Sequence, residues 1–408
     1  MIGKERDGML SLKGIMLRRY ALFCVILFGC GLWAAAADPK ALYDQSTDAL
    51  YNLDFSTAQH GYETLTHDYP GNPDYWNALA SSLWLRIMYD QQKLNLESFS
   101  GDSFGTKDSR DTVSAADEKR LRDTLATAID KADAMLKTNP KDVRALYAKG
   151  ISNAMLASFE ASAKRSYLSA GSKAKAARDL HQQVLNIDPN FDDARMTVGA
   201  VNYTVGVMPG FIRFLLMPLG IRSDGKDVGI QQLETAAAKG KNSATDARLM
   251  LIIVYNREKR YNEALKNVTE LHERYPRNFI FELTQANTYG KLKRWDDAIR
   301  TYEKILTKVE EKKDGYERLP AYRVHYSIGS ANIERYQFET ALTNFDRVVQ
   351  TKEASPNAKG NAYLWMGKIY DSSGRREQAL KQYDAILGLN CDSELKSQAQ
   401  QFKRKPFK

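Results

Sequence analysis

Histidine is the side chain here best suited to acid–base chemistry or metal binding, because its pKa lies near neutrality and its ring nitrogens coordinate transition metals. The chain of 408 residues contains five histidines. His60 and His67 can share one face of a helix, but no third ligand stands at a useful spacing from them. We therefore expect these two side chains on a solvated helix surface, and we expect no metal site.

No complete motif supports phosphate binding or nucleophilic catalysis. Residues 238–242 (AKGKN) resemble the end of a P-loop but lack its leading glycine and its Ser or Thr. Neither His-Glu-x-x-His nor a nucleophile elbow occurs. Cys391 is the one cysteine outside the first 37 residues, and we expect an inert thiol there. The sequence therefore predicts a protein that is not an enzyme and needs no cofactor.

Residues 1–37 have the composition of a secretory signal peptide. Basic residues precede an apolar stretch, and four alanines (residues 34–37) follow it. We predict cleavage near Ala37 and export to the periplasm or the exterior. The net charge is +9, of which this leader contributes +3, and the remainder is spread along the chain. That distribution favours solubility over nucleic-acid binding.

Two other fates of the leader remain open. The stretch from Tyr20 to Ala37 could stay as a short membrane anchor, near the lower limit of about 17 residues for a spanning helix. Alternatively, residues 27–30 resemble a bacterial lipobox with Cys30 as the lipidated residue, although Phe28 is bulky where a small residue is usual. Either fate would associate the protein with a membrane through its N-terminus.

An internal repeat dominates the rest of the sequence. In the C-terminal half, four alanines are each followed by apolar residues four and seven positions later, which places all three on one face of an α-helix. A second stripe of small and aromatic residues precedes each alanine by about twelve positions. The alanines are Ala264, Ala298, Ala341 and Ala379, spaced by 34, 43 and 38 residues. We expect antiparallel helix pairs that approach closely at the small residues, with aromatic side chains filling the gaps between adjacent pairs.

The N-terminal half has the same pattern in a degraded form. Its second helices are predicted to end before Pro70, Pro140 and Pro189, because proline cannot continue a helix. Gly150 and Gly199 take the small position of their first helices. We count eight hairpins over 39–390. The predicted units are a degenerate array at 39–242, a regular array at 243–390, and a capping helix with a basic tail at 391–408.

This pattern resembles the tetratricopeptide repeat (TPR). The resemblance implies an all-α, right-handed superhelical solenoid of TPR-like helix hairpins. A central segment is also loosely similar to the inclusion-body-clearance TPR family and its bacterial relatives, through Met208-Pro209-x-Phe211, residues 215–220 (LLMPLG) and the Asp224-Gly225 pair with Gly229. That second resemblance implies a helical scaffold and carries over no catalytic residue.

The segment 205–221 is the most distinctive insertion. It is apolar but contains two prolines and an arginine, which argues against a membrane span. It is either a flap that covers an adjacent hairpin or an exposed lip for a partner, an apolar ligand or lipid. The lip would consist of Met208, Phe211, Phe214, Leu215 and Leu216. A lipid or small-ligand carrier is therefore the alternative function.

A TPR stack presents its first helices on a concave face, where polar side chains can bind an extended peptide. Counting from the small positions places six candidates on that face: Asn256, Asn287, Arg323, Tyr326, Asn361 and Lys368. Their pattern departs from the carboxylate clamp of chaperone-binding TPR domains. The predicted function is an exported scaffold that binds protein or peptide partners, within a bacterial cell-envelope complex.

Overall fold

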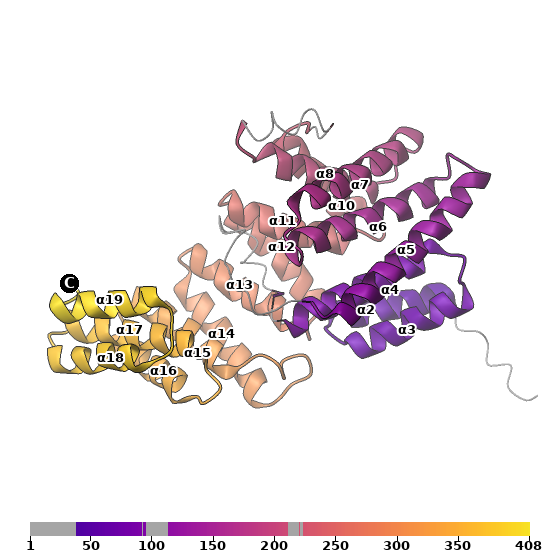
Figure 1. Ribbon diagram of the computed structural model, residues 1–408. Helices are drawn as coiled ribbons and strands as arrows, with labels where there is room; N and C mark the ends of the chain where they lie inside the picture. Colours follow the sequence, from indigo (N-terminus) through magenta and orange to yellow (C-terminus); the bar gives the residue numbers. More distant parts are fainter. Residues whose placement is uncertain (1–37, 92, 95–112, 211–219, 221–222) are drawn as a thin grey trace, which may run out of the picture.

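The computed structural model describes residues 38–91, 93–94, 113–210, 220 and 223–408, and the helices are numbered as in Figure 1. Within these residues the chain forms 17 α-helices and no strand. Sixteen of the helices form eight antiparallel hairpins, and the last helix caps the array. The predicted all-α solenoid of helix hairpins is confirmed.

All eight hairpins are pairs of α-helices, and they follow one another along the chain. The first four are α2 (Pro39–Tyr51) with α3 (Phe55–Asp68), α4 (Pro73–Asp90) with α5 (Ala115–Thr138), α6 (Val143–Ser162) with α7 (Tyr167–Ile187), and α8 (Ala194–Gly206) with α10 (Lys226–Lys239). The next four are α11 (Ala244–Arg257) with α12 (Tyr261–Arg274), α13 (Phe279–Lys291) with α14 (Trp295–Glu310), α15 (Ala321–Glu334) with α16 (Phe338–Gln350), and α17 (Pro356–Ser372) with α18 (Arg376–Gly388). The cap is α19 (Ser393–Arg404).

Proline and capping residues set the helix boundaries in the N-terminal half. The helices α3, α5 and α7 each end two residues before Pro70, Pro140 and Pro189, as predicted. Polar residues just beyond two of these prolines begin the next helices: the side chains of Asn72 and Asp142 accept hydrogen bonds from the first-turn amides of α4 and α6. These local signals fix where each hairpin ends.

The aromatic residues of the repeat do not lie where we expected. Instead of filling the gap between hairpins, the aromatic ring on a second helix covers the small residue on the first helix of the same hairpin. A Cβ atom on Gly367 would lie 2.4 Å from the Tyr383 ring, and one on Gly329 would lie 2.8 Å from the Phe345 ring. Small and large residues are therefore complementary within each pair, which is why the motif needs both.

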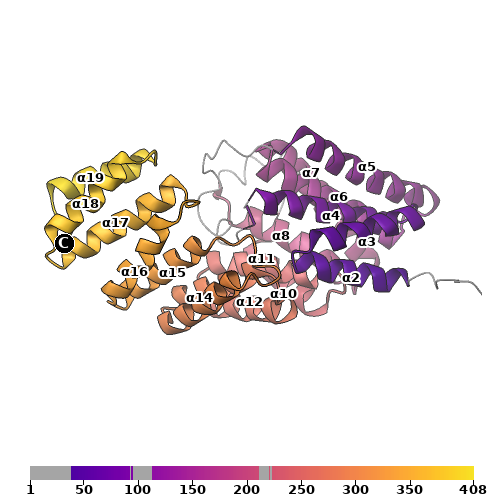
Figure 2. The same ribbon diagram turned by 90° about the horizontal axis from the view of Figure 1, so that it is seen from below.

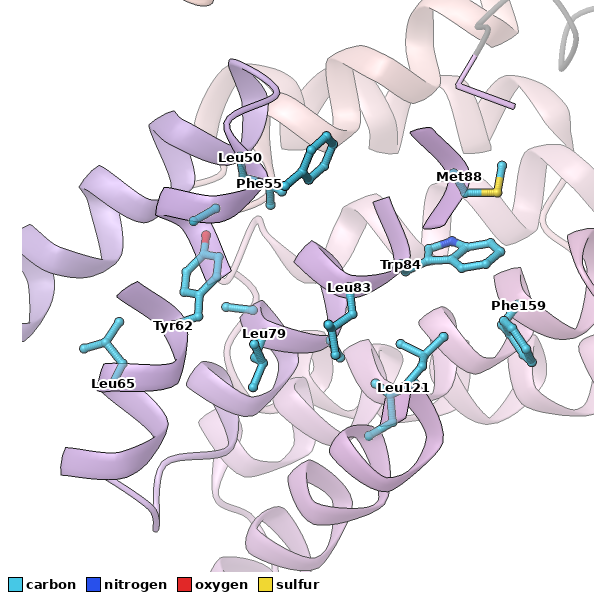
Figure 3. Close-up of a cluster of buried hydrophobic side chains, with 14 of the residues drawn as sticks. Leu50, Phe55, Tyr62, Leu65, Leu79, Leu83, Trp84, Met88, Leu121 and Phe159 are labelled. Carbon is cyan, nitrogen blue, oxygen red and sulfur yellow. The ribbon is translucent and has the colours of Figure 1, made fainter. Parts of the chain in front are cut away.

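The first three hairpins share one apolar core, shown in Figure 3. Tyr62 of α3 and Leu79 of α4 are almost fully buried in it. At its far end the Trp84 ring meets the Phe159 ring of α6 edge-on, with centroids 5.4 Å apart. This Trp84–Phe159 contact, unlike the rings over the small residues, joins the second hairpin to the third, because each hairpin has an apolar face that it cannot bury alone.

A repeated tyrosine–arginine contact holds the tight hairpin turns of the C-terminal half. The guanidinium of Arg294, before α14, lies 4.6 Å from the ring centroid of Tyr289, near the end of α13. The same pair occurs as Arg260 with Tyr255 at 4.4 Å and as Arg375 with Tyr370 at 4.7 Å. The spacing Tyr-x-x-x-x-Arg is thus a second signature of these three hairpins, which we did not predict.

The insertions lengthen some hairpins and add structure to others. Residues 158–172 lengthen the third hairpin, in which α6 and α7 have 20 and 21 residues. The connection between α4 and α5 spans residues 91–114, since α5 begins at Ala115. Residues 95–112 of this connection lie outside the described residues. In the described part of the chain no helix is long and apolar enough to span a membrane.

The long spacing between Ala298 and Ala341 is explained by the connection 311–320. This connection folds back beneath α13, and its Tyr316 is almost fully buried. The Tyr316 hydroxyl donates a hydrogen bond to the buried carboxylate of Glu282, which the Lys308 ammonium also contacts at 2.8 Å. Burial and the negative charge of Glu282 raise the pKa of Tyr316. The connection is thus a fixed part of the sixth hairpin.

The N-terminal hairpins close against the middle of the array. At the end of α2, the Tyr51 hydroxyl donates to Asp246 of α11 at 2.5 Å, and the Tyr51 carbonyl accepts from the Asn278 side chain at 2.7 Å. The Tyr51 and Tyr275 rings are 5.0 Å apart. Figures 1 and 2 both show α2 and α4 beside α11–α14, while α15–α19 project away as an arm. The first five or six hairpins therefore form a closed turn of solenoid.

His181 is a buried histidine that packs onto Gly150. Its ring is fully buried, stacks on Tyr147 with centroids 4.8 Å apart, and bonds the Tyr147 carbonyl through Nε2 at 3.0 Å. A Cβ atom on Gly150 would lie 2.2 Å from this ring. Burial lowers the pKa of His181 to about 4. The ring is therefore neutral in the folded protein at neutral pH.

This shift predicts a loss of stability in acid. An unfolded histidine titrates near 6.5, so the neutral ring stabilises the fold fully above that pH, and the contribution falls as the pH drops from 6.5 toward 4. By pH 5 the loss should be about 2 kcal/mol. Urea unfolding at pH 7.5 and pH 5 measures it. His181→Gln keeps a donor for the Tyr147 carbonyl but cannot ionise, so an equal pH dependence in this variant would refute the assignment.

Candidate functional site

Two of the predicted groove residues, Asn287 and Arg323, line the same pocket. The pocket has a volume of about 80 Å³. That is space for on the order of five water molecules, or for one side chain. Its lining comes from α4, α13, α15 and the connections near them: Tyr89, Asp90, Leu94, Phe279, Ile280, Leu283, Thr284, Asn287, Arg318 and Arg323.

Helix α13 forms the floor of this pocket. Ile280, Leu283, Thr284 and Asn287 stand at intervals of three and four residues, so they lie along one face of the helix. The Thr284 hydroxyl is buried and donates to the Ile280 carbonyl at 2.7 Å. The floor is therefore apolar near the N-terminal end of α13 and polar at Asn287.

Helix α4 forms the opposite wall, more than 180 residues away in the sequence. The Tyr89 ring lies 6.4 Å from the Phe279 ring, and the Arg318 guanidinium lies 5.2 Å from the Tyr89 ring. Arg318 also forms an ion pair with Asp90, which Arg86 contacts at 3.6 Å. This wall forms because the N-terminal hairpins close against the middle of the array. The connection 311–320 then places Arg318 beside Tyr89 and Asp90 of α4.

The polar groups of the pocket differ in what they already bind. Asn287 Oδ1 accepts a hydrogen bond from the Tyr302 hydroxyl, which leaves its amide nitrogen directed elsewhere. Arg323 is half-buried at the start of α15, and within the described residues its guanidinium has neither an ion pair nor a hydrogen bond. The unmet capacity of these two side chains is that of hydrogen-bond donors.

Two other candidates are engaged with their own helices. Asn256 is buried, donates to the Ile252 carbonyl at 2.8 Å and accepts from Lys291 at 2.9 Å. Asn361 donates to the Asn357 carbonyl at 2.9 Å. Asn256 therefore stabilises the stack from inside and is not open to a partner in this conformation.

The last two groove candidates lie toward the C-terminal end. The Tyr326 ring meets the Phe345 ring edge-on at 5.5 Å. The Lys368 ammonium lies 4.6 Å from the Trp365 ring. The rings of Phe402 in the cap and of Phe407 in the tail lie 5.4 and 5.2 Å from it. Burial lowers the pKa of Lys368. The chain's own C-terminal residues thus occupy the space around Lys368.

The apolar lip falls mostly outside the described residues. Phe211, Phe214, Leu215 and Leu216 are not described, and Met208 is half-buried after the end of α8. The far end of the insertion is tied back to α8: Asn202 Nδ2 donates to Asp224 at 3.0 Å, and the Ser223 hydroxyl donates to the Asn202 carbonyl at 2.7 Å. The lip stays a prediction.

The half of the pocket that comes from α4 and from Arg318 was not predicted from the sequence. The 43-residue spacing between Ala298 and Ala341 indicated an insertion. The spacing did not indicate which distant helix the inserted residues would contact.

The helix pairs, their small-residue contacts and the capped end define a helical-repeat solenoid. A family model described as "Tetratricopeptide repeat" matches residues 43–86, which cover most of α2, all of α3 and most of α4. The match and the helix hairpins together support a TPR protein. No curated protein matches the sequence.

Several solved structures are similar at low sequence identity. Yeast Tom70 is 13% identical, with 98% of this chain and 96% of that chain covered and a TM-score of 0.35. A tetratricopeptide repeat protein from Parabacteroides merdae is 15% identical, with 89% and 97% covered and a TM-score of 0.27. The human IFIT1 dimer with m7Gppp-AAAA is 13% identical, with 91% and 89% covered and a TM-score of 0.40. We draw nothing from these likenesses about what this chain binds.

Proposed function

We propose that this protein is an interaction scaffold that holds an extended segment of a protein partner at the pocket between α4, α13 and α15. The observation that supports this best is the pair Asn287 and Arg323. Both were predicted from repeat position alone to face a partner, and both line a pocket with unmet donors. A TPR solenoid supplies an extended surface on which further contacts can align the segment.

We also propose that the scaffold is exported and works in a bacterial cell-envelope complex. The composition of residues 1–37 supports this, and those residues lie outside the described part of the chain. N-terminal sequencing and mass determination of the protein from fractionated cells test it. A mature chain beginning at Asp38 supports export with cleavage. A lipidated Cys30 would replace that proposal with membrane attachment, and an intact cytoplasmic chain would contradict it.

Photo-crosslinking tests the binding face itself. A photoreactive phenylalanine analogue at Leu283, in the pocket, should yield a discrete protein adduct in cells that express the chain naturally. The matched control places the analogue at Lys304, which is exposed on α14 of the same hairpin. Adducts from Leu283 and none from Lys304 support the scaffold. The same adducts from both positions, or none from Leu283, would contradict binding at this pocket.

A further inference from the structure

A second pocket lies at the N-terminal end of α4, where the turn from α3 meets α5 and α6. Its volume is about 390 Å³, which is within the range of about 300–1,000 Å³ for small-molecule sites. Asp74 of this pocket stands 15 residues before Tyr89 of the first pocket, about 22 Å away along α4. Among the described residues the two pockets share no lining side chain. We propose that this second pocket, the Tyr69 pocket, binds a neutral sugar ring of a glycan.

The turn 69–73 forms the floor of the Tyr69 pocket and is held by hydrogen bonds. The Asn72 amide donates to the Tyr69 carbonyl at 3.0 Å, and the Asn72 side chain accepts from the Asp74 amide at 3.1 Å. No atom lies within 4 Å of a Cβ atom placed on Gly71, so the space above the floor is open. A floor fixed in this way loses little conformational freedom on binding, which favours the affinity for a small ligand.

Tyr69 supplies an aromatic wall whose orientation is fixed by other rings. Tyr69 is 40% exposed, and its ring meets the Tyr75 ring edge-on with centroids 5.9 Å apart. The Tyr75 ring in turn lies 6.0 Å from the Tyr43 ring of α2. Met135 of α5 also lines the pocket and adds an apolar thioether. The C–H face of a sugar ring can pack on such a surface, because that face is apolar while the hydroxyls project from the edge of the ring.

Asp74 of α4 and Arg144 of α6 supply the polar groups of the pocket and form an ion pair, with Arg144 Nη2 3.0 Å from Asp74 Oδ2. Within the described residues neither side chain makes a further hydrogen bond. A charged ligand would have to break this pair to gain one of its own, which removes most of the benefit. A hydroxyl both donates and accepts, so two neighbouring hydroxyls can donate to Asp74 Oδ1 and accept from Arg144 while the pair stays intact. The polar groups therefore favour a neutral ligand with adjacent hydroxyls.

Saturation-transfer difference NMR with the full chain tests this proposal. The probes are maltose, cellobiose and diacetylchitobiose, which are neutral disaccharides, and indole, which is aromatic but has no hydroxyl. We expect at least one disaccharide to bind with a Kd on the order of 1 mM or lower. Its affinity should change little between low and high salt, because the ligand carries no charge. Binding of indole alone, or of none of the four probes, would overturn the proposal.

Variants of the pocket locate the binding. Tyr69→Ala should weaken the disaccharide about fivefold or more through loss of the ring, and Arg144→Gln about tenfold through loss of a charge-assisted hydrogen bond. Tyr336→Ala and Arg120→Gln are the matched controls, because both side chains are exposed and neither lines the pocket. All four variants should keep the wild-type circular dichroism. Affinities equal to those of the controls would overturn the proposal. Cross-linking from Leu283 should be the same in all four, which separates this site from the scaffold function.

Discussion

Replacing Gly229 by valine should separate α8 from α10 and destabilise the fourth hairpin by about 3 kcal/mol or more. The two helices cross backbone to backbone here. A Cβ atom on Gly229 would lie 2.5 Å from the Tyr203 amide nitrogen and 2.7 Å from the Gly199 carbonyl oxygen. Neither atom can rotate away as a side chain could, so the helices themselves must move, and the cost should reach the upper end of the range for overpacking.

Urea unfolding followed by circular dichroism measures the global effect, and hydrogen exchange of α8 and α10 locates it. Gly71→Ala is the matched control, because nothing lies within 4 Å of a Cβ atom there. We expect that variant to be as stable as the wild type, or slightly more stable, since alanine reduces the freedom of the unfolded chain. Equal stability of the valine variant and the control would mean that α8 and α10 do not cross at these glycines.

Ala298→Glu should have the second large effect, with a loss of about 4 kcal/mol or more in the sixth hairpin. Ala298 is 1% exposed on α14 and lies in a core with Ala286 and Tyr302. A carboxylate at this position would be buried without a partner, which is among the most costly of substitutions. Loss of the cooperative unfolding transition, or exposure of α13–α16 to limited proteolysis, would register the effect.

Asn287→Ala in the same hairpin is the comparison. Asn287 accepts a hydrogen bond from the Tyr302 hydroxyl, so its side chain contributes to stability. A loss of about 1 kcal/mol is therefore expected. If the glutamate variant were no less stable than the alanine variant, the close packing of α14 on α13 would be disproved.

The hairpins could be predicted because their causes are local. Proline ends a helix wherever it falls, and a small residue must oppose a large one across a pair of neighbouring helices. Gly199, Ala298 and Pro140 therefore indicated helix boundaries and contacts directly. The position of Asn287 and Arg323 on a shared face followed from helical periodicity, and both lie in the pocket.

The half of the pocket that comes from α4 could not be predicted, because its position depends on the summed rotations of several hairpins. Small rotations between successive hairpins add up over five units before α4 meets α13, and no short pattern records their sum. Asn256 shows the same limit on a smaller scale. Its repeat position is right for a groove, but Lys291 from the next hairpin reaches over and engages it.

The contact of Tyr51 with Asp246 and Asn278 changes how the molecule should respond to mechanical load. An open row of hairpins peels apart one unit at a time, because each unit is held only by the next. A row whose first unit is clasped to its fifth and sixth behaves as a loop, in which several bonds must break together before any unit yields. Tension applied between the two ends would therefore unfold α15–α19 gradually at low force. The looped portion would unfold afterwards, at higher force and in one abrupt step.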